Sequence, residues 1–468
     1  MSEVHLQSAQ QIQTAVVSGQ AKARDIVAAT LARISALNPK LGAFTDVTAE
    51  RALAKADAID AARARGETLG PLAGAPFAVK NLFDVKGLPT RAGSKINRER
   101  APASADAILV QRMEAAGAIL VGALNMGEYA YDFTGENAHD GASRNPHDLA
   151  HMSGGSSGGS GSAVAGGLTP LALGSDTNGS IRVPSSLCGI FGLKPTYGRL
   201  SRTGSFPFVA SFDHLGPFAR SVADLAAAYD AMQGADPHDP AQAPRPFEPT
   251  SSGLEESAAN LRIASLGGYF TRGAELAALE AVERVADALG ARRRTVELPE
   301  AARARAAAYL ITMVEGASLH ADQLRQRSGD YDPDVRDRLI AGEMLPGAWV
   351  VKAQKFRSWF RARALDLFRE VDVLIAPATP CRAPKIGQRT FMLGGEELLV
   401  RPNLGIFTQP ISFIGLPVVA APVWTSGERL PIGVQIITAP WREDLALRVA
   451  RALERDGVVS APIGRAAS

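Results

Sequence analysis

Apolar residues recur with a helical period along residues 8–66, a segment rich in alanine. Ser8 and Thr48 stand where they can cap a first and a third helix, and Asn38-Pro39 stands where it can end a second. The third helix is expected to run to Gly66. The pattern therefore predicts that residues 1–66 form a helical segment packed on the rest of the chain.

Beyond residue 66, short apolar runs alternate with amphipathic stretches. The runs read as strands at residues 74–80, 118–122, 261–266, 373–376, 417–421 and 431–437. The stretches read as helices at residues 105–116, 275–289, from about 350 onward, and 443–456. Such alternation is typical of an α/β fold, with a largely parallel or mixed β-sheet covered by helices on both faces.

One segment, residues 234–253, is irregular by composition, with the sequence ADPHDPAQAPRPFEPTSSG from residue 235. It is either a domain boundary or an excursion within a larger domain. Similar strand patterns precede and follow it, which favours the excursion. We therefore expect residues 67–468 to form one catalytic domain, and no internal repeat is apparent.

Charge and composition narrow the function classes. Lys and Arg number 50 and Asp and Glu 48, a net charge of +2, which gives no reason to expect direct contact with nucleic acid. Two cysteines without close spacing favour neither a disulfide framework nor a cysteine-based zinc site, and no metal or cofactor is predicted. The N-terminus lacks the features of a signal peptide, and the longest apolar stretches are too short to span a membrane. We expect a cytoplasmic protein.

Residues 152–162 read MSGGSSGGSGS. A flexible linker is disfavoured, because an apolar stretch typical of a buried helix and strand follows at once. A phosphate-binding loop is disfavoured too, since Ser160 and Gly161 stand where Lys and Ser or Thr are required. The remaining interpretation is a loop whose backbone packs tightly around a reacting atom.

Two further residues are candidates for catalysis. Ser180 in GSDTNGSIRVP follows a strand and precedes a helix, so backbone N–H groups and the helix dipole surround it, as in an oxyanion hole. An ordinary helix cap would look the same. Lys80 ends an apolar strand, where burial would favour its neutral, basic form, although a solvated strand-end lysine is the simpler interpretation. None of the seven histidines lies in a motif of the G-x-S-x-G type.

Together, Lys80 in FAVKN, Ser156 in GGSSGGS and Ser180 in GSDTNGSIRVP resemble the amidase signature family. The resemblance implies a large mixed sheet between helices and a Ser-Ser-Lys triad. Ser180 would be the nucleophile, Ser156 the bridging serine after a cis peptide bond, and Lys80 the base. The implied oxyanion hole consists of the backbone N–H groups of Thr177, Asn178, Gly179 and Ser180. Ser157 is expected to steady this relay by hydrogen bonding.

Two positions depart from the family pattern. Asn178 stands where the family commonly has glycine, and asparagine tolerates a left-handed backbone well. Asn81 follows the lysine where Asp is common, and an uncharged neighbour helps to keep Lys80 neutral. We expect Asp176 and Arg182 to form a structural ion pair.

Within the family, AGSKINR at 92–98, RNPHD at 144–148 and DHLGP at 213–217 resemble the biuret-hydrolase-like branch. This implies an amidohydrolase that releases ammonia from a small ureido-type amide, biuret- or 1-carboxybiuret-like. It also implies a small helical accessory subunit and, as the assembly, either a homodimer or a heterotetramer. The residues expected to contact substrate are Tyr129, Tyr131, Asn178 and Arg325.

Two alternatives stay open. The first is the glutaminase subunit of a glutamyl-tRNA(Gln) amidotransferase, whose core motifs are very similar but against which Asn178 counts. The second is a non-catalytic scaffold of the same fold, which would be expected to have lost the nucleophile or the lysine. All three triad positions are intact.

Overall fold

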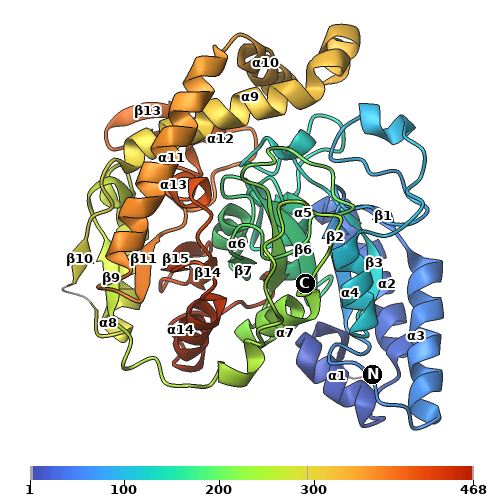
Figure 1. Cartoon of the computed structure of the whole chain (residues 1–468). Helices are drawn as coiled ribbons and strands as arrows, with labels where there is room; N and C mark the ends of the chain where they lie inside the picture. Colours follow the sequence, from blue (N-terminus) through green and yellow to red (C-terminus); the bar gives the residue numbers. More distant parts are fainter. Residues whose placement is uncertain (1–3, 292–293, 466–468) are drawn as a thin grey trace.

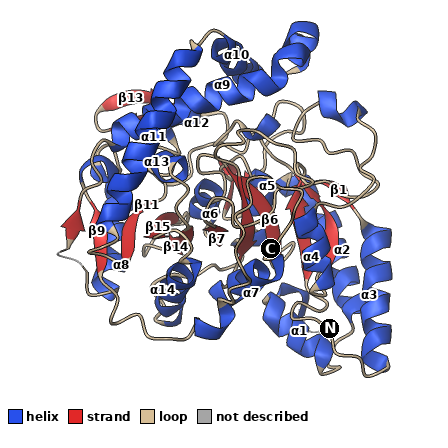
Figure 2. Cartoon of the chain, viewed as in Figure 1, coloured by secondary structure: helices blue, strands red, loops and turns tan. Residues whose placement is uncertain are grey.

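A mixed sheet of eleven strands forms the centre of the computed structural model, which describes residues 4–291 and 294–465 (Figure 1). Helices cover it on both faces, as Figure 2 shows, and the predicted α/β fold is confirmed. The strand order is β1 (Phe44–Val47), β3 (Ile119–Leu124), β2 (Pro76–Lys80), β6 (Leu171–Asp176), β8 (His214–Ala219), β7 (Phe191–Lys194), β14 (Val418–Val423), β15 (Ile432–Thr438), β11 (Val373–Pro377), β9 (Ile263–Leu266) and β10 (Thr295–Val296).

Two short antiparallel pairs lie outside this sheet, β4 (Arg144–Asn145) with β5 (Asp148–Met152) and β12 (Thr390–Leu393) with β13 (Glu396–Leu399). The helices are α1 (Ala9–Val17), α2 (Ala23–Leu41), α3 (Ala49–Ala64), α4 (Ile108–Ala115), α5 (Gly158–Ala165), α6 (Arg182–Cys188), α7 (Val222–Met232), α8 (Leu276–Ala288), α9 (Ala301–Arg327), α10 (Pro333–Glu343), α11 (Gly347–Leu367), α12 (Val400–Asn403), α13 (Gln409–Phe413) and α14 (Glu443–Arg455). Helix α9 packs against both α10 and α11 in the upper part of Figure 1.

The first N-terminal helix has the predicted cap, whereas the predicted end of the second helix needs correction. The Ser8 hydroxyl accepts a hydrogen bond from the Gln11 backbone N–H at 3.2 Å, and the Gln11 side chain accepts one from the Ser8 N–H at 3.0 Å. The prediction that Asn38-Pro39 ends the second helix is wrong, because α2 continues to Leu41. Proline is accommodated in the last turn, and the helix ends where Gly42 adopts a left-handed backbone (φ 61°).

Helix α3 begins after Thr48, as predicted, but the Thr48 hydroxyl does not cap it. That hydroxyl donates to the Leu120 carbonyl at 3.1 Å and so ties the start of α3 to β3. The preceding strand β1 pairs antiparallel with β3 and was not predicted. It is short and half polar, so its sequence has no recognisable strand period.

The sheet sets the position of the site. Strands β2 and β6 are parallel neighbours in which Val79 lies opposite Leu173. Their carboxyl ends, at Lys80 and Asp176, therefore meet at the same edge of the sheet. Strands before and after residues 234–253 belong to this one sheet, while the division at residue 66 stays a prediction.

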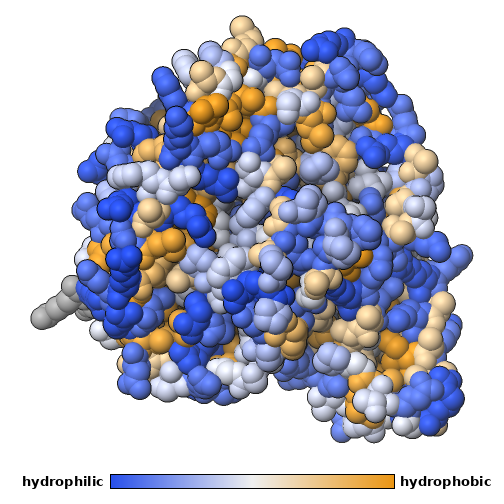
Figure 3. All heavy atoms as spheres, viewed as in Figure 1, coloured by the Kyte–Doolittle hydropathy of each residue, from blue (hydrophilic) through white to orange (hydrophobic). Residues whose placement is uncertain are grey.

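The surface in Figure 3 is mostly hydrophilic, with apolar areas between the charged groups. Exposed large apolar side chains are most frequent on α11, where they are Trp349, Val351 and Trp359. Within the described residues, no helix combines the length and apolar character needed to cross a membrane.

Candidate active site

Lys80 lies at the carboxyl end of β2 with its side chain fully buried. Its Nζ donates to the Ser156 Oγ at 2.7 Å and to the Ser175 Oγ at 2.8 Å. The Ser157 hydroxyl donates to the Ser175 carbonyl at 3.2 Å and accepts from the Ser175 N–H at 3.3 Å. The structure thus places one lysine between two buried hydroxyl groups, and the predicted hydrogen-bonding contribution of Ser157 is made through Ser175.

Burial lowers the pKa of Lys80 to about 7. The carboxylates of Asp213, Asp176 and Asp132 oppose this shift, because negative charge favours the ammonium form. Burial has the larger effect. A substantial fraction of Lys80 is therefore neutral near neutral pH, the state in which its amine can accept a proton.

The Gly/Ser run is buried from Ser153 to Ser162, which excludes a solvated linker. The peptide bond between Gly155 and Ser156 is cis. At Gly155, a Cβ atom would lie 2.3 Å from the Asp132 Oδ2, and at Gly159 one would lie 2.5 Å from the Ala43 carbonyl oxygen. Only glycine fits these two positions, and their close packing directs Ser156 towards Lys80.

Ser180 lies in the turn between β6 and α6, and an ion pair closes this turn. Asp176 and Arg182 are both fully buried, with the Arg182 Nη2 3.0 Å from the Asp176 Oδ1. The Asp176 Oδ2 also accepts from the Ile181 N–H at 3.2 Å, and Arg182 Nη1 donates to the Gln435 side chain at 2.7 Å. The neighbouring guanidinium keeps the pKa of Asp176 below its usual range despite burial. The pair holds the turn rigidly, as a structural role requires.

Backbone donors surround Ser180. Within the described part of the chain, the N–H groups of Asn178, Gly179 and Ser180 have no hydrogen-bond partner. Gly179 has φ 144°, and a Cβ atom there would lie 2.2 Å from the Thr408 Oγ1. The Thr408 hydroxyl donates to the Asn178 carbonyl at 2.8 Å, which orients the peptide. Unpaired N–H groups in a rigid turn are suited to bind a developing oxyanion.

A cavity opens beside Ser180, and Tyr131, Thr177 and Asn178 are among the residues that line it. The Asn178 Nδ2 donates to the Thr312 Oγ1 at 2.9 Å, whereas its Oδ1 is buried without a hydrogen-bond partner among the described residues. Burial raises the pKa of Tyr131 to about 12, so its hydroxyl stays protonated. The Asn178 Oδ1 is therefore an acceptor that is free to meet an N–H of a bound amide.

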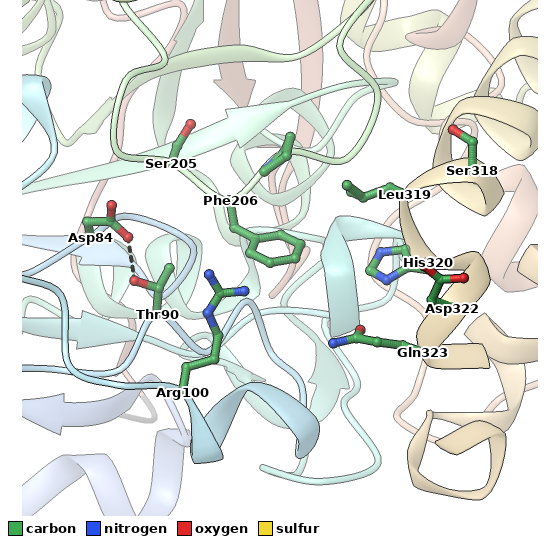
Figure 4. A pocket seen from close by; sticks show the side chains of 11 residues that line it. Asp84, Thr90, Arg100, Ser205, Phe206, Ser318, Leu319, His320, Asp322 and Gln323 are labelled. Atoms are coloured by element: carbon green, nitrogen blue, oxygen red, sulfur yellow. Dashed lines mark hydrogen bonds between the residues drawn. The ribbon is translucent and has the colours of Figure 1, made fainter. Parts of the chain in front are cut away.

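Tyr129 is not among the residues that line the cavity at Ser180. Its ring lies 4.0 Å from the His320 ring and 5.5 Å from the Phe206 ring, centroid to centroid. Phe206 and His320 line a second cavity of about 390 Å³, shown in Figure 4 with the Arg100 guanidinium beside the Phe206 ring. Tyr129 therefore packs against residues that line this second cavity.

The prediction that Arg325 contacts substrate needs correction. Its side chain is 70% exposed on α9 and pairs with Asp322 at 3.0 Å. Thr312, on the same helix, lines the cavity, and Arg325 lies about 20 Å further along the helix axis. The arginine that does line the cavity is Arg338 of α10.

Sequence reasoning missed Ser175 and Arg338. Ser175 had a usable signal, since it lies in the GSDTNGSIRVP motif near the carboxyl end of the buried strand β6. Arg338 had none, because it lies in an amphipathic helix with several other charged residues. Among the described residues, no group of three His, Cys, Asp or Glu side chains is placed to hold a metal ion.

Comparison with known proteins agrees with this geometry. A family model described as Amidase matches residues 25–447. The chain is 54% identical over 444 residues to AtzE, a subunit of the 1-carboxybiuret hydrolase of Pseudomonas sp. (strain ADP), covering 95% of this chain and 97% of that protein. It is 38% identical to a glutamyl-tRNA(Gln) amidotransferase subunit from Anaeromyxobacter sp. (strain K), covering 94% of each.

Among solved structures, one of a vestigial protein complex that reveals the evolutionary origins of an s-triazine catabolic enzyme matches with a TM-score of 0.96. It is 54% identical and covers 97% of this chain and 100% of that chain. A crystal structure of an amidase matches with a TM-score of 0.85 at 30% identity, covering 96% of this chain and 100% of that chain. The chain therefore belongs to the amidase family and is a hydrolase of amide carbon–nitrogen bonds.

Proposed function

We propose that this protein hydrolyses a small ureido-type amide and releases ammonia through a covalent acyl-enzyme. In this proposal Ser180 is the nucleophile, Ser156 relays protons and Lys80 is the base. The observation that carries it is the 2.7 Å contact between the buried Lys80 Nζ and the Ser156 Oγ. A buried amine with a pKa lowered to about 7 is suited to general-base catalysis near neutral pH.

The reaction proceeds by coupled proton transfers. The Ser180 Oγ attacks the amide carbon while its proton passes to Ser156 and the Ser156 proton passes to Lys80. The carbonyl oxygen becomes an oxyanion beside the backbone N–H groups of residues 177–180. The protons then return: Ser156 protonates the leaving nitrogen, Lys80 reprotonates Ser156, the carbon–nitrogen bond breaks and ammonia leaves. Water attacks the acyl-enzyme through the same relay, which yields a carboxylate or carbamate and restores Ser180.

The relatives support the substrate class. The relative at 54% identity acts, by its name, on 1-carboxybiuret, whereas the amidotransferase relative is 38% identical. The free Oδ1 of Asn178 adds a physical argument, because a ureido group presents N–H donors on both sides of its carbonyl. Glycine at position 178 would provide no such acceptor.

The same relatives support an accessory partner. The 54% identical protein is named as one subunit of its enzyme, and the solved structure at TM-score 0.96 is of a protein complex. We infer that this chain acts together with a small accessory protein. Its helical character and the homodimeric or heterotetrameric assembly stay predictions, which purification with and without co-expressed small proteins and a measurement of the assembly mass would test.

Ammonia release from four compounds tests the function: biuret, 1-carboxybiuret, glutamine and a simple aliphatic amide. We expect turnover of the ureido compounds by the wild type and at least about a 10⁴-fold lower kcat in Ser180→Ala. Ser160→Ala is the matched control. Ser160 is a buried serine of the same Gly/Ser run whose hydroxyl donates to the Leu173 carbonyl at 3.1 Å, so this variant should retain activity. Turnover of glutamine alone would favour the amidotransferase alternative, and full activity in Ser180→Ala would exclude the assigned nucleophile.

A further inference from the structure

Asp132 has a buried carboxylate in the wall of the cavity at Ser180. Its Oδ1 accepts from the Thr134 N–H at 2.9 Å, and its Oδ2 accepts from the Gly135 N–H at 2.7 Å. The Arg401 Nη1 lies 2.9 Å from the Asp132 Oδ1. Burial of a carboxylate is costly unless hydrogen-bond donors and an opposite charge compensate it, and this carboxylate has both.

The Asp132 side chain packs against the backbone that holds Ser156. A Cβ atom at Gly155 would lie 2.3 Å from the Asp132 Oδ2, and the Gly155 N–H donates to the Phe133 carbonyl at 2.9 Å. A Cβ atom at Gly127 would lie 2.3 Å from the Asp132 Cβ, and the Gly127 N–H donates to the Ser156 carbonyl at 3.1 Å. Asp132 therefore contacts both the residue before Ser156 and the residue that hydrogen-bonds to the Ser156 carbonyl.

The same carboxylate acts on Lys80 through its charge. Asp213, Asp176 and Asp132 are the carboxylates that raise the pKa of Lys80 against the effect of burial. Asp176 pairs with Arg182 at 3.0 Å, and Asp213 accepts hydrogen bonds from a hydroxyl and two backbone N–H groups. The charge of Asp132, in contrast, is compensated by an arginine far away in the sequence.

That arginine, Arg401 of α12, is the one ion-pair partner of Asp132 among the described residues. Its side chain is only 15% exposed. Three further carboxylates face Arg401: Asp332, Asp334 and Glu136. The closest of their contacts is the 3.4 Å between the Arg401 Nη2 and Asp334, which itself pairs at 2.7 Å with Arg389. Arg401 is therefore held in place beside Asp132 and not free to turn towards solvent.

We propose that Arg401 is a positioning residue of the catalytic relay: through Asp132 it holds the backbone at Ser156 and offsets the negative charge near Lys80. This inference rests on the proposed roles of Lys80, Ser156 and Ser180 but not on the ureido substrate. Without Arg401, the uncompensated Asp132 carboxylate would favour the ammonium form of Lys80, which cannot accept a proton. Without the carboxylate, Lys80 would be neutral over a wider range of pH.

The rate at which methanesulfonyl fluoride modifies Ser180 tests the proposal without an amide substrate. The Ser180 Oγ bonds to sulfur, fluoride leaves, and the serine proton passes through Ser156 to Lys80, so the rate follows the neutral fraction of Lys80. In the wild type the rate should fall below about pH 7. We expect this acidic limb to move up by about one pH unit in Arg401→Gln and down by about one pH unit in Asp132→Asn.

Both variants should also lower the rate on the alkaline plateau by about tenfold, because each loosens the backbone at Ser156. The double variant Asp132→Asn/Arg401→Gln has neither charge, so its limb should return close to that of the wild type while its plateau stays low. Arg401→Lys keeps the charge and should keep the limb in place. Mass spectrometry of the modified chain identifies the serine that has reacted.

Arg389→Gln is the matched control. Arg389 is 68% exposed and pairs with Asp334, a carboxylate that also faces Arg401, but it forms no ion pair with Asp132 among the described residues. This variant should change neither the limb nor the plateau. Thermal unfolding of each variant establishes that the folded protein is being measured. Should Arg401→Gln not fold, the expected downward shift in Asp132→Asn and its reversal in the double variant still decide the question.

Limbs that stay in place in Arg401→Gln and Asp132→Asn, or that move in the same direction in both, would overturn the proposal. A purely structural role would lower the plateau without opposite shifts of the limb. Ammonia release separates this proposal from the proposed function. Opposite shifts in an enzyme that hydrolyses no ureido compound would defeat only the substrate class, whereas fixed limbs in a ureido hydrolase would defeat only the role of Arg401. An unmodified Ser180 in the wild type would defeat the assigned nucleophile and this proposal with it.

Discussion

Two lysines of the central sheet, Lys80 and Lys194, are equally buried but have different surroundings. Both are fully buried at the end of a strand, and burial lowers the pKa of each to about 7. Lys80 lies where β2 meets β6, and its Nζ donates to two serine hydroxyls. Lys194 ends β7 beside β14, and its Nζ donates to the carbonyls of Pro195, at 3.1 Å, and Leu416.

The difference lies in what the partners can do with a proton. A hydroxyl both accepts and donates, so Ser156 can pass a proton to Lys80 and receive one from another group. A carbonyl only accepts, so the partners of Lys194 can hold its hydrogens but can give none back. A lowered pKa is therefore insufficient to identify a catalytic lysine, and the hydrogen-bond partners separate the two cases.

The largest expected effect is at Lys80. Lys80→Met keeps an unbranched apolar chain of similar length but removes the proton acceptor, so kcat should fall by about 10⁴-fold. Ammonia release under saturating substrate measures this change. Because methionine suits a buried site, the variant should remain folded, which circular dichroism checks. Residual activity above a few per cent would show that another group acts as the base.

A smaller effect is expected at Ser175, which we regard as a positioning residue for Lys80. Ser175→Ala should lower kcat/KM by about tenfold, because one of two hydrogen bonds that orient the Nζ is lost. It should also move the acidic limb of the pH–rate profile to lower pH, since an acceptor that favours the ammonium form is removed. A merely structural role would leave that limb in place.

The pH dependence of the wild type tests the protonation state directly. The pKa of Lys80 is lowered to about 7, so the neutral, active form dominates above that pH and the ammonium form below it. We expect kcat/KM to be level in the alkaline range and to fall up to about tenfold per pH unit below pH 7. A profile that is flat down to pH 5.5 would contradict Lys80 as the base.

The smallest effect on activity is expected at Lys194. Lys194→Met should leave kcat within about threefold of the wild type and keep the acidic limb near pH 7, because no hydroxyl relay depends on this amine. Stability should fall by about 1–3 kcal/mol, since two buried carbonyls lose their donor. Chemical denaturation measures the stability. Loss of the acidic limb in this variant would assign the limb to Lys194 and remove the distinction between the two lysines.

Sequence reasoning could propose most of the candidate site because motifs depend on local structural requirements. The Gly/Ser run was interpreted as a tight buried loop, and the contacts at Gly155 and Gly159 show why a side chain would not fit there. One predicted strand ends at Lys80 and another ends shortly before Ser180. Both ends could be predicted because the strands are short apolar runs in the sequence. Strand β1 was missed because it is short and half polar.

Substrate contacts were predicted less well, for a physical reason. Arg325 and Arg338 are both arginines of amphipathic helices, and no sequence pattern distinguishes them. Their positions depend on how α9 and α10 pack against each other, which brings Arg338 to the Ser180 cavity and leaves Arg325 exposed. Helical periodicity shows which residues share one face of a helix but not which other element that face meets.

The sequence by itself determined the fold class, the amidase family and the three residues of the proposed triad, because these depend on local pattern and motif. Only the tertiary structure decided which charges are balanced. The Asp132–Arg401 ion pair and the position of Arg338 at the Ser180 cavity arise between segments far apart in the chain. Electrostatic energy depends on distance in space and on burial, and neither quantity is encoded in the spacing of residues along the sequence.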